Sequence, residues 1–472
     1  MRKKTNKNST PVSKGDNIAL EIEDMNHQGE GLGRYEGFTV FVPGALPGEN
    51  VSCEVISVKK NYARAFIKDI NMSSKERVKP PCPYYDKCGG CQLQHLSYQG
   101  QLRFKEKQVK DSLEKIGKID LGEVEFLPIL GMKTPWNYRN KIQLPVREFE
   151  NNVEIGFFKQ NSHELVPVEH CMIQDEKGNK ALTKVKELIK KYELSPYDER
   201  DKKGLLRHVV IRIGINTDEV LLIFVTSKNQ FPHRKRIVAE LIEAIPGIIG
   251  IVHNINDRDT NVILGEKNKT IWGRPYLFDK LEGLKFKISP GAFYQINAYQ
   301  SGKLYNKSVE LSGVEYGEDK RVLDAYSGIG TIALFFSLYT SDTSDVLGLE
   351  VVPEAVEAAV ENARINNLDK KVSFWEGKVE DLIYEYIDDF TNKPKPDIFV
   401  LDPPRKGCDR RFLDAILELK PEKVIYISCN PSTLARDLNI LSTGDYKLKT
   451  VQPVDMFPQT VHIEAVVLIE KE

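Results

Sequence analysis

Apolar and polar residues alternate with a period of two between residues 17 and 70, and Gly and Pro separate the alternating runs. A two-residue period is typical of β-strands with one buried and one exposed face. The runs cover residues 18–25, 38–44, 49–58 and 62–70. So many short strands in so small a segment predict a small β-barrel over residues 15–74.

The hydrophobic period changes after the barrel. Apolar residues at helical spacing form one stripe, which predicts an amphipathic helix, and we expect residues 100–131 to dock on the C-terminal domain. The stripe consists of Leu102, Val109, Leu113 and Ile116. Mixed strand and helix patterns follow, and they predict a central α+β domain formed by residues 75–99 and 132–290.

The last part of the chain, residues 291–472, alternates apolar strand patterns with amphipathic helix patterns. The expected strands lie within residues 321–328, 345–352, 371–377, 397–405, 423–430 and 462–470. This order is typical of an α/β fold with a doubly wound parallel sheet. Such sheets bind ligands at the carboxyl ends of their strands, so residues there are the first candidates for chemistry.

The length, charge and apolar runs of the chain limit the classes of protein to which it can belong. A chain of 472 residues is too long for one core, and its net charge of -1 hides a basic stretch at residues 1–14, which we expect to be a disordered tail. The longest apolar run, Val220–Val225, is far below the ~18 residues of a membrane span. No secretory apolar region follows the basic stretch. We therefore expect a soluble, cytoplasmic protein that does not bind membranes.

Basic and aromatic residues lie side by side in the barrel sequence. Lys59, Lys60 and Arg64 flank Tyr62, and Arg34 precedes Tyr35. Small barrels of the OB type often hold nucleic acid through phosphate contacts and base stacking. The same pattern is also typical of an ordinary solvated strand face.

A glycine loop marks a nucleoside site in the C-terminal domain. Asp324 ends one strand, Gly328 and Gly330 follow, and Glu350 ends the next strand. Two glycines without a third favour a cofactor smaller than a dinucleotide, and a strand-end carboxylate suits ribose hydroxyls. This arrangement resembles the S-adenosylmethionine site of class I (Rossmann-like) methyltransferases.

Asp402 ends a further strand in the motif DPPRKG. A carboxylate at this edge lies beside both cofactor and substrate. The D-P-P motif is also found in amino-methyltransferases, which usually place an aromatic residue next. Here Arg405 follows, which weakens that alternative.

Cys429 and Glu464 fit one reaction. The C5 carbon of uracil is too electron-poor to attack a methyl sulfonium, but a thiolate that adds to C6 makes C5 nucleophilic. The reaction then needs a base for the C5 proton. Cys429 ends a strand and precedes a predicted helix, whose positive end would lower the thiol pKa. Glu464 lies in an apolar strand, where burial raises a carboxyl pKa, although a carboxylate at a strand edge has the same pattern.

Four motifs, SCNPSTLARD, DMFPQTVHIE, SPGAFYQIN and LDPPRKG, resemble those of the RNA uracil-C5 methyltransferases, in particular their ribosomal RNA branch. The resemblance covers the chain beyond the basic tail, and it implies that Cys429 is the nucleophile and Glu464 the general base. It places Gln295, Tyr326, Glu350 and Asp402 at cofactor contacts. The barrel resembles a TRAM domain. Lys378 stands where the wider methyltransferase pattern often has Asp or Asn, so the adenine contact stays unassigned.

Three cysteines crowd together with the spacing Cys82-x5-Cys88-x2-Cys91, and Cys171 is a candidate fourth ligand. Spacing alone permits either zinc or an iron-sulfur cluster. The resemblance implies a structural [4Fe-4S] cluster in the central domain. We interpret His170 as a polar neighbour, and Cys53 and Cys408 as packing residues.

The sequence thus predicts methyl transfer from S-adenosylmethionine to C5 of uridine in 23S rRNA, on a base flipped out of its stack. The expected partner is 23S or pre-ribosomal RNA, and no obligate protein partner is evident. The tRNA-modifying relatives lack the barrel and the cluster, which favours ribosomal RNA. Alternatives are a tRNA uracil-C5 methyltransferase, an RNA amino-methyltransferase that uses the DPPR motif, and a pure RNA-binding or assembly factor.

Overall fold

The computed structural model describes residues 10–388 and 395–472. Most of the predicted basic tail, residues 1–9, lies outside this range, and Val12 near the tail's end is buried in the barrel core. The chain forms two compact units. The first extends to Gln108 and includes Phe457–Val461, and the second comprises Val109–Met456 and His462–Glu472.

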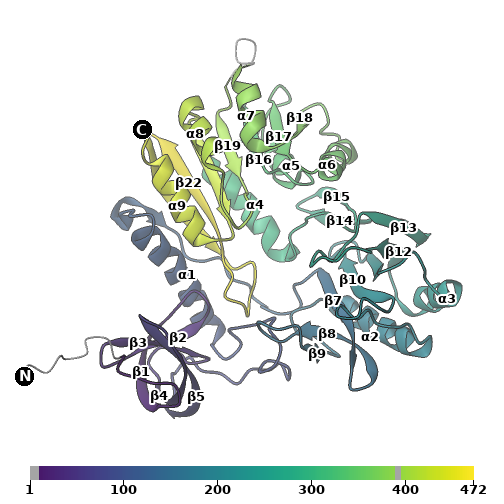
Figure 1. The fold of residues 1–472 in the computed structure, drawn as a ribbon. Helices are drawn as coiled ribbons and strands as arrows, with labels where there is room; N and C mark the ends of the chain where they lie inside the picture. The colour runs from purple at the N-terminus through teal and green to yellow at the C-terminus, as the bar shows by residue number, and fades with distance from the viewer. Residues whose placement is uncertain (1–9, 389–394) are drawn as a thin grey trace, which may run out of the picture. The chain divides into compact units, whose positions relative to one another are not determined.

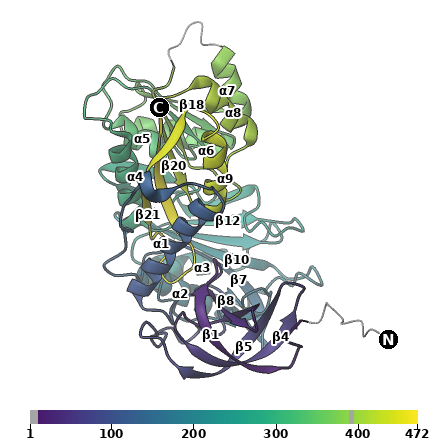
Figure 2. The same ribbon diagram turned by 90° about the vertical axis from the view of Figure 1, so that its left-hand side faces the viewer.

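The first unit contains a closed five-stranded barrel, which confirms the predicted barrel (Figure 2). Its strands pair in the order β1-β2-β3-β5-β4. They are β1 (Asn17–Met25), β2 (Glu30–Tyr35), β3 (Phe38–Pro43), β4 (Asn50–Val58) and β5 (Tyr62–Met72). Alternate residues of β1 are buried, as the two-residue period requires, and they build a core of their own.

A buried ion pair fixes the segment that follows the barrel. The Glu49 carboxylate is fully buried and accepts hydrogen bonds from Leu46 N–H at 2.9 Å and from Arg77 Nη2 at 2.8 Å. A bidentate pair of this kind compensates the loss of hydration of both ions. Residues 75–99, predicted to join the central domain, belong to the same compact unit as the barrel.

Helix α1 (Tyr98–Lys115) crosses from the first unit into the second. Val109 and Leu113 of the predicted stripe are fully buried in the core of the second unit. Ile116 follows the helix and is 47% exposed, whereas Lys105 is fully buried and donates to Phe457 O at 3.0 Å. The buried face therefore accepts a lysine because a backbone carbonyl compensates its ammonium group.

After the end of α1, the second unit contains η1 (Leu121–Glu123) and a seven-stranded sheet in the order β13-β12-β11-β10-β7-β8-β9. Its strands are β7 (Lys141–Phe149), β8 (Asn152–Phe158), β9 (Leu165–Pro167), β10 (Leu206–Ile213), β11 (Val220–Thr226), β12 (Ile248–Ile255) and β13 (Lys267–Gly273). Helices α2 (Glu176–Lys191) and α3 (Arg234–Ala244) pack against this sheet and close its core.

A hairpin of β14 (Leu277–Leu281) and β15 (Leu284–Ile288) leads to an eight-stranded sheet in the order β18-β17-β16-β19-β20-β22-β21-β6. The strands are β6 (Glu125–Phe126), β16 (Val322–Ala325), β17 (Val346–Glu350), β18 (Val372–Glu376), β19 (Ile398–Leu401), β20 (Lys423–Ser428), β21 (Tyr446–Val454) and β22 (Glu464–Lys471). β16 to β20 are parallel, and β22 is antiparallel between β20 and β21.

Helices cover both faces of this sheet (Figure 1). α7 (Val379–Asp388), α8 (Arg410–Leu419) and α9 (Pro431–Leu441) share one core with the second half of α1. α4 (Ala298–Ser312), α5 (Thr331–Ser337) and α6 (Pro353–Ile365) pack on the other face. The predicted doubly wound fold is therefore confirmed for β16 to β20, whereas β22, expected within the parallel sheet, is antiparallel. None of the helices in the described ranges has the length and apolar character needed to cross a bilayer.

Candidate active site

The candidate residues of the C-terminal domain gather at one edge of the eight-stranded sheet. Ala325 of β16 pairs with Leu349 of β17 and with Leu401 of β19, and Leu401 pairs with Tyr426 of β20. The strands are parallel, so their carboxyl ends meet at the same edge. That edge carries the predicted residues Tyr326, Glu350, Asp402 and Cys429.

The loop after β16 has a backbone that favours glycine. Gly328 and Gly330 have φ angles of +55° and +82°, and Tyr326 also has a positive φ. A Cβ at Gly328 would meet no atom within 4 Å, whereas one at Gly330 would lie 2.8 Å from the Phe374 ring. Gly330 therefore permits close packing, and Gly328 faces open space.

Two carboxylates hold this loop. Asp324 is fully buried and accepts a hydrogen bond from Ala333 N–H in α5 at 2.9 Å. Burial raises its pKa well above the usual range, and Oδ1 has no hydrogen-bond partner among the described residues. The Glu350 carboxylate accepts from Gly328 N–H and from Val352 N–H, each at 2.9 Å.

These features fit a nucleoside cofactor such as S-adenosylmethionine. Open space beside a glycine backbone admits a ligand, and the buried oxygen of Asp324 has unused hydrogen-bonding capacity. Gln295 is buried in the segment between β15 and α4, where its backbone carbonyl accepts from Asn140 Nδ2 at 2.9 Å. Lys378 is exposed after β18, and no residue is assigned to the adenine contact.

Cys429 and Glu464 face each other across a strand pair. β20 ends at Ser428, β22 begins at Glu464, and Ser428 pairs with Ala465 in the antiparallel register. Extending this register by one residue beyond the end of β20 would set Cys429 opposite Glu464, because antiparallel partners run in opposite directions. The Glu464 carboxyl is also one of the charges that shift the Cys429 pKa. The Cys429 side chain is half-buried, whereas Glu464 is only 3% exposed. Glu464 Oε2 has no hydrogen-bond partner among the described residues.

The charges around the thiol differ from the sequence-based expectation. Burial, together with the carboxyls of Glu464 and Asp402, raises the pKa of Cys429 to about 12, and Arg405 opposes this shift. Desolvation therefore outweighs the helix start that we expected to lower it. The thiol of the free protein is protonated at neutral pH.

The two carboxyls are shifted in the same direction. Burial raises the pKa of Asp402 to about 7. Burial, with a contribution from Asp402, raises the pKa of Glu464 well above its usual range, and Arg405 opposes the shift. Carboxyls with raised pKa values are suited to accept protons near neutral pH.

Arg405 is a site residue that sequence reasoning did not assign. Its guanidinium group lies 3.4 Å from the ring nitrogens of His462, and it is the cation that favours the ionised forms of both Cys429 and Glu464. The available signal was its place, three residues after the strand-end Asp402. The pattern could not show which way the side chain points.

The described residues contain no cluster of side chains that matches the predicted metal site. Cys82, Cys88 and Cys91 belong to the first unit, and Cys171 belongs to the second. Across residues 10–388 and 395–472, no three His, Cys, Asp or Glu side chains are grouped so that they could hold a metal ion. Gly90 N–H does lie 3.4 Å from Cys88 Sγ, a contact that is also compatible with a plain thiol.

Comparison with known proteins assigns the family. The family model described as tRNA (Uracil-5-)-methyltransferase matches residues 259–472, and the TRAM domain model matches residues 11–68. An RNA methyltransferase from Halalkalibacterium halodurans is 44% identical over 98% of this chain and 99% of its own. One from Clostridium tetani is 43% identical over 98% of both chains. The chain belongs to the RNA uracil-5-methyltransferase family.

A solved structure extends the family likeness to the whole fold. The tRNA (uracil-54, C5)-methyltransferase of Pyrococcus abyssi, in complex with S-adenosyl-L-homocysteine, covers 96% of this chain and 100% of its own, with a TM-score of 0.73 and 27% identity. The expected S-adenosylmethionine-dependent RNA methyltransferase and its TRAM domain are thus confirmed. A tRNA enzyme of equal extent removes our argument that the extra parts favour ribosomal RNA.

Proposed function

We propose that this RNA uracil-5-methyltransferase works through a covalent bond between Cys429 and the target uridine. The observation that carries the proposal is the pairing of β20 with β22, with Cys429 directly after the end of β20 and Glu464 at the start of β22. A nucleophile and a base on facing strand ends can reach the two adjacent ring carbons of one pyrimidine.

The steps follow from the two side chains. Cys429 gives up its proton to solvent, and Sγ adds to C6 of uracil while the C5=C6 electrons move toward the C4 carbonyl as an enolate. S-adenosylmethionine, when bound, supplies the electrophilic methyl group that C5 accepts. Glu464 takes the C5 proton, the double bond re-forms, and Sγ leaves C6.

The raised pKa values of Cys429 and Glu464 bear on how each group is activated. A thiol with a pKa of about 12 is inert until something stabilises its anion, and Arg405 is the cation in place to do so. The raised pKa of Glu464 makes its carboxylate a stronger base for a carbon-bound proton. We infer that Cys429 reacts through the thiolate that Arg405 favours, because further loss of water would by itself raise the thiol pKa.

The cofactor contacts stay part of this proposal. We propose that Glu350 accepts from ribose hydroxyls and that Asp324, Gly328 and Gly330 shape the loop beside them. The hydrogen bond from Gly328 N–H to the Glu350 carboxylate and the positive φ angles of the two glycines support this. Tyr326, Gln295 and Asp402 are the further candidates at cofactor contacts. Support comes from the common sheet edge and from the S-adenosyl-L-homocysteine complex of the Pyrococcus relative.

RNA containing 5-fluorouridine tests the covalent step. Fluorine at C5 cannot be removed as a proton, so the wild-type protein should accumulate an RNA adduct that survives denaturation. Cys429→Ala should form no adduct and transfer no methyl group, yet still bind S-adenosyl-L-homocysteine. Methyl transfer by Cys429→Ala would instead favour an amino-methyltransferase, and binding of RNA without any transfer would indicate an assembly factor.

We propose 23S rRNA as the substrate, with tRNA as the second candidate. The motif resemblance to the ribosomal RNA branch supports the first, and the fold shared with a tRNA enzyme supports the second. The two are separated by mapping 5-methyluridine in ribosomal and transfer RNA from cells that lack the protein. Loss of the modification from tRNA alone would overturn the 23S assignment.

A structural [4Fe-4S] cluster is also proposed, and it rests on the cysteine pattern of the sequence alone. The ligands would be the thiolates of Cys82, Cys88, Cys91 and Cys171. Iron and sulfide analysis of anaerobically purified protein tests it, with four irons and four sulfides expected per chain. One zinc ion and no sulfide would contradict it, as would metal-free protein of full activity.

A further inference from the structure

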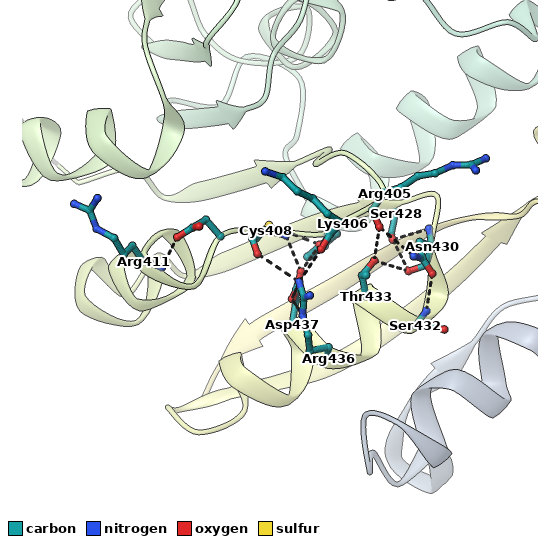
Figure 3. Close-up of polar contacts among 12 residues, drawn as sticks. Arg405, Lys406, Cys408, Arg411, Ser428, Asn430, Ser432, Thr433, Arg436 and Asp437 are labelled. Carbon is teal, nitrogen blue, oxygen red and sulfur yellow. Dashed lines mark hydrogen bonds and ion pairs between the residues drawn. The ribbon is translucent and has the colours of Figure 1, made fainter. Parts of the chain in front are cut away.

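The loop that carries Asp402 and Arg405, residues 402–409, is tied to helix α9 by side chains of that helix (Figure 3). Asn430 Nδ2 donates to Arg405 O at 3.0 Å. Thr433 Oγ1 lies 3.3 Å from the same carbonyl and 3.1 Å from Asn430 O, and its single proton is shared between these two acceptors. Arg436 Nη2 donates to Lys406 O at 2.9 Å. Two consecutive carbonyl groups of the loop are thus held by one helix.

Asp437 anchors the end of the loop. Its carboxylate is fully buried and accepts from Cys408 N–H at 2.9 Å and from Tyr426 O–H of β20 at 2.7 Å. Arg436 Nε donates to its other oxygen at 2.8 Å. A buried carboxylate with three donors is well compensated, and removing the Arg436 guanidinium would leave its charge without this cation.

The loop is shaped for this close approach. Gly407 has a φ of +78°, and a Cβ there would lie 2.5 Å from the side-chain atoms of both Arg436 and Asp437. Only glycine allows the backbone to run so near the two charged side chains. The glycine of the DPPRKG motif is therefore explained by the close approach of helix α9.

Asn430 serves two ends at once. Its Oδ1 accepts from Ser432 N–H at 3.1 Å as the N-cap of α9, while its Nδ2 holds the loop. Aspartate or serine could cap the helix but could not donate from a side-chain amide. The residue directly after Cys429 thus links the start of the helix to the loop that bears Arg405.

We propose that Asn430, Thr433, Arg436 and Asp437 are positioning residues that hold the 402–409 loop so that Arg405 stays beside Cys429. The proposal rests on the proposed role of Cys429. The charged groups that shift the thiol pKa are Glu464 of β22, and Asp402 and Arg405 of the loop, and both carboxyls also act on Tyr305 of α4. Among these charged groups Arg405 is the one that favours the thiolate, and the backbone N–H of Cys429 acts in the same direction. Loosening the loop should therefore weaken the contribution of Arg405.

The test measures alkylation of Cys429 by iodoacetamide in the full-length protein as a function of pH, with peptide mapping to separate the other cysteines. In Asn430→Ser/Thr433→Val the helix cap persists, but Arg405 O loses both donors. The alkylation rate at pH 8 should fall by about three- to tenfold, because each unit of thiol pKa changes the thiolate fraction tenfold. Thr433→Ser alone, which keeps the hydroxyl, should retain most of the rate.

Thr443→Val is the matched control, since Thr443 Oγ1 donates to Ile440 O at the far end of the same helix. It should leave the pH profile unchanged, while both valine variants lose similar stability. Superimposable profiles of the double variant and the wild type would overturn the proposal. Alkylation requires no RNA, so it reports on the loop even if Cys429→Ala proves active and the covalent mechanism fails.

Discussion

Glu464 is a carboxyl group that the fold buries without full compensation. One of its oxygens lacks a hydrogen-bond partner among the described residues, and Asp402 adds a like charge nearby. Such a group is stabilised when it is protonated. Its raised pKa thus ties the stability of the catalytic domain to pH.

Glu464→Gln should stabilise the protein, and more so at high pH. The folded-state pKa of Glu464 lies above the unfolded value, so the stability it contributes is present at low pH and lost as pH rises through the folded pKa. Glutamine does not titrate. We expect a melting temperature about 2–4 °C above wild type at pH 8, on the order of 1 kcal/mol, and little difference at pH 5.

Thermal melts of both proteins at several pH values check this. A gap between the two curves that does not change with pH would show that the carboxyl does not titrate with a raised pKa. A lower melting temperature for Glu464→Gln at pH 8 would mean that the carboxylate is well paired in the native state.

At the scale of elements, the turn between β16 and α5 carries two glycines with different tasks. Gly330 is the N-cap of α5, and a Cβ added there would lie 2.8 Å from the Phe374 ring. A Cβ added at Gly328 would enter open space. Both have positive φ angles, which alanine tolerates poorly. A substitution at Gly330 therefore tests packing, whereas a substitution at Gly328 tests the space available to a ligand.

Gly330→Ala should lower stability by about 2–4 kcal/mol, the sum of backbone strain and overpacking against Phe374. Gly328→Ala should cost only the strain, about 1–2 kcal/mol, but should weaken S-adenosyl-L-homocysteine binding at least tenfold. Denaturant unfolding and calorimetric titration measure the two effects. Unchanged affinity in Gly328→Ala would place the cofactor elsewhere.

At the scale of the whole molecule, the barrel has its own core and forms one unit with the residues that follow it. Lys59 and Lys60 are exposed there, next to Tyr62, which packs edge-on against Phe41. A TRAM domain in an RNA methyltransferase leads us to expect that these lysines contact phosphates.

Lys59→Gln/Lys60→Gln should weaken RNA binding and reduce the salt slope of log K by about 2, with unchanged S-adenosyl-L-homocysteine affinity. Lys180→Gln/Lys190→Gln on α2 removes the same charge from exposed positions and is the control. Filter binding at several salt concentrations gives the slope. Equal effects of both double variants would mean that only net charge matters.

The sequence by itself determined the local features. The two-residue period of the barrel, the strand–helix alternation and the residues at strand ends depend only on neighbours along the chain, so Cys429, Glu350 and Asp402 were found there. The motifs also identified the family. Val12 and Ile116 were misjudged because their exposure depends on distant residues.

Only the tertiary structure decided what faces what. Placing β22 between β20 and β21 sets Glu464 opposite Cys429, and burying Asp437 ties α9 to the loop of Arg405. It also reversed the expected pKa shift of the thiol, because desolvation depends on all the atoms around a group. Strand pairing and burial join residues far apart in sequence, and no local pattern encodes them.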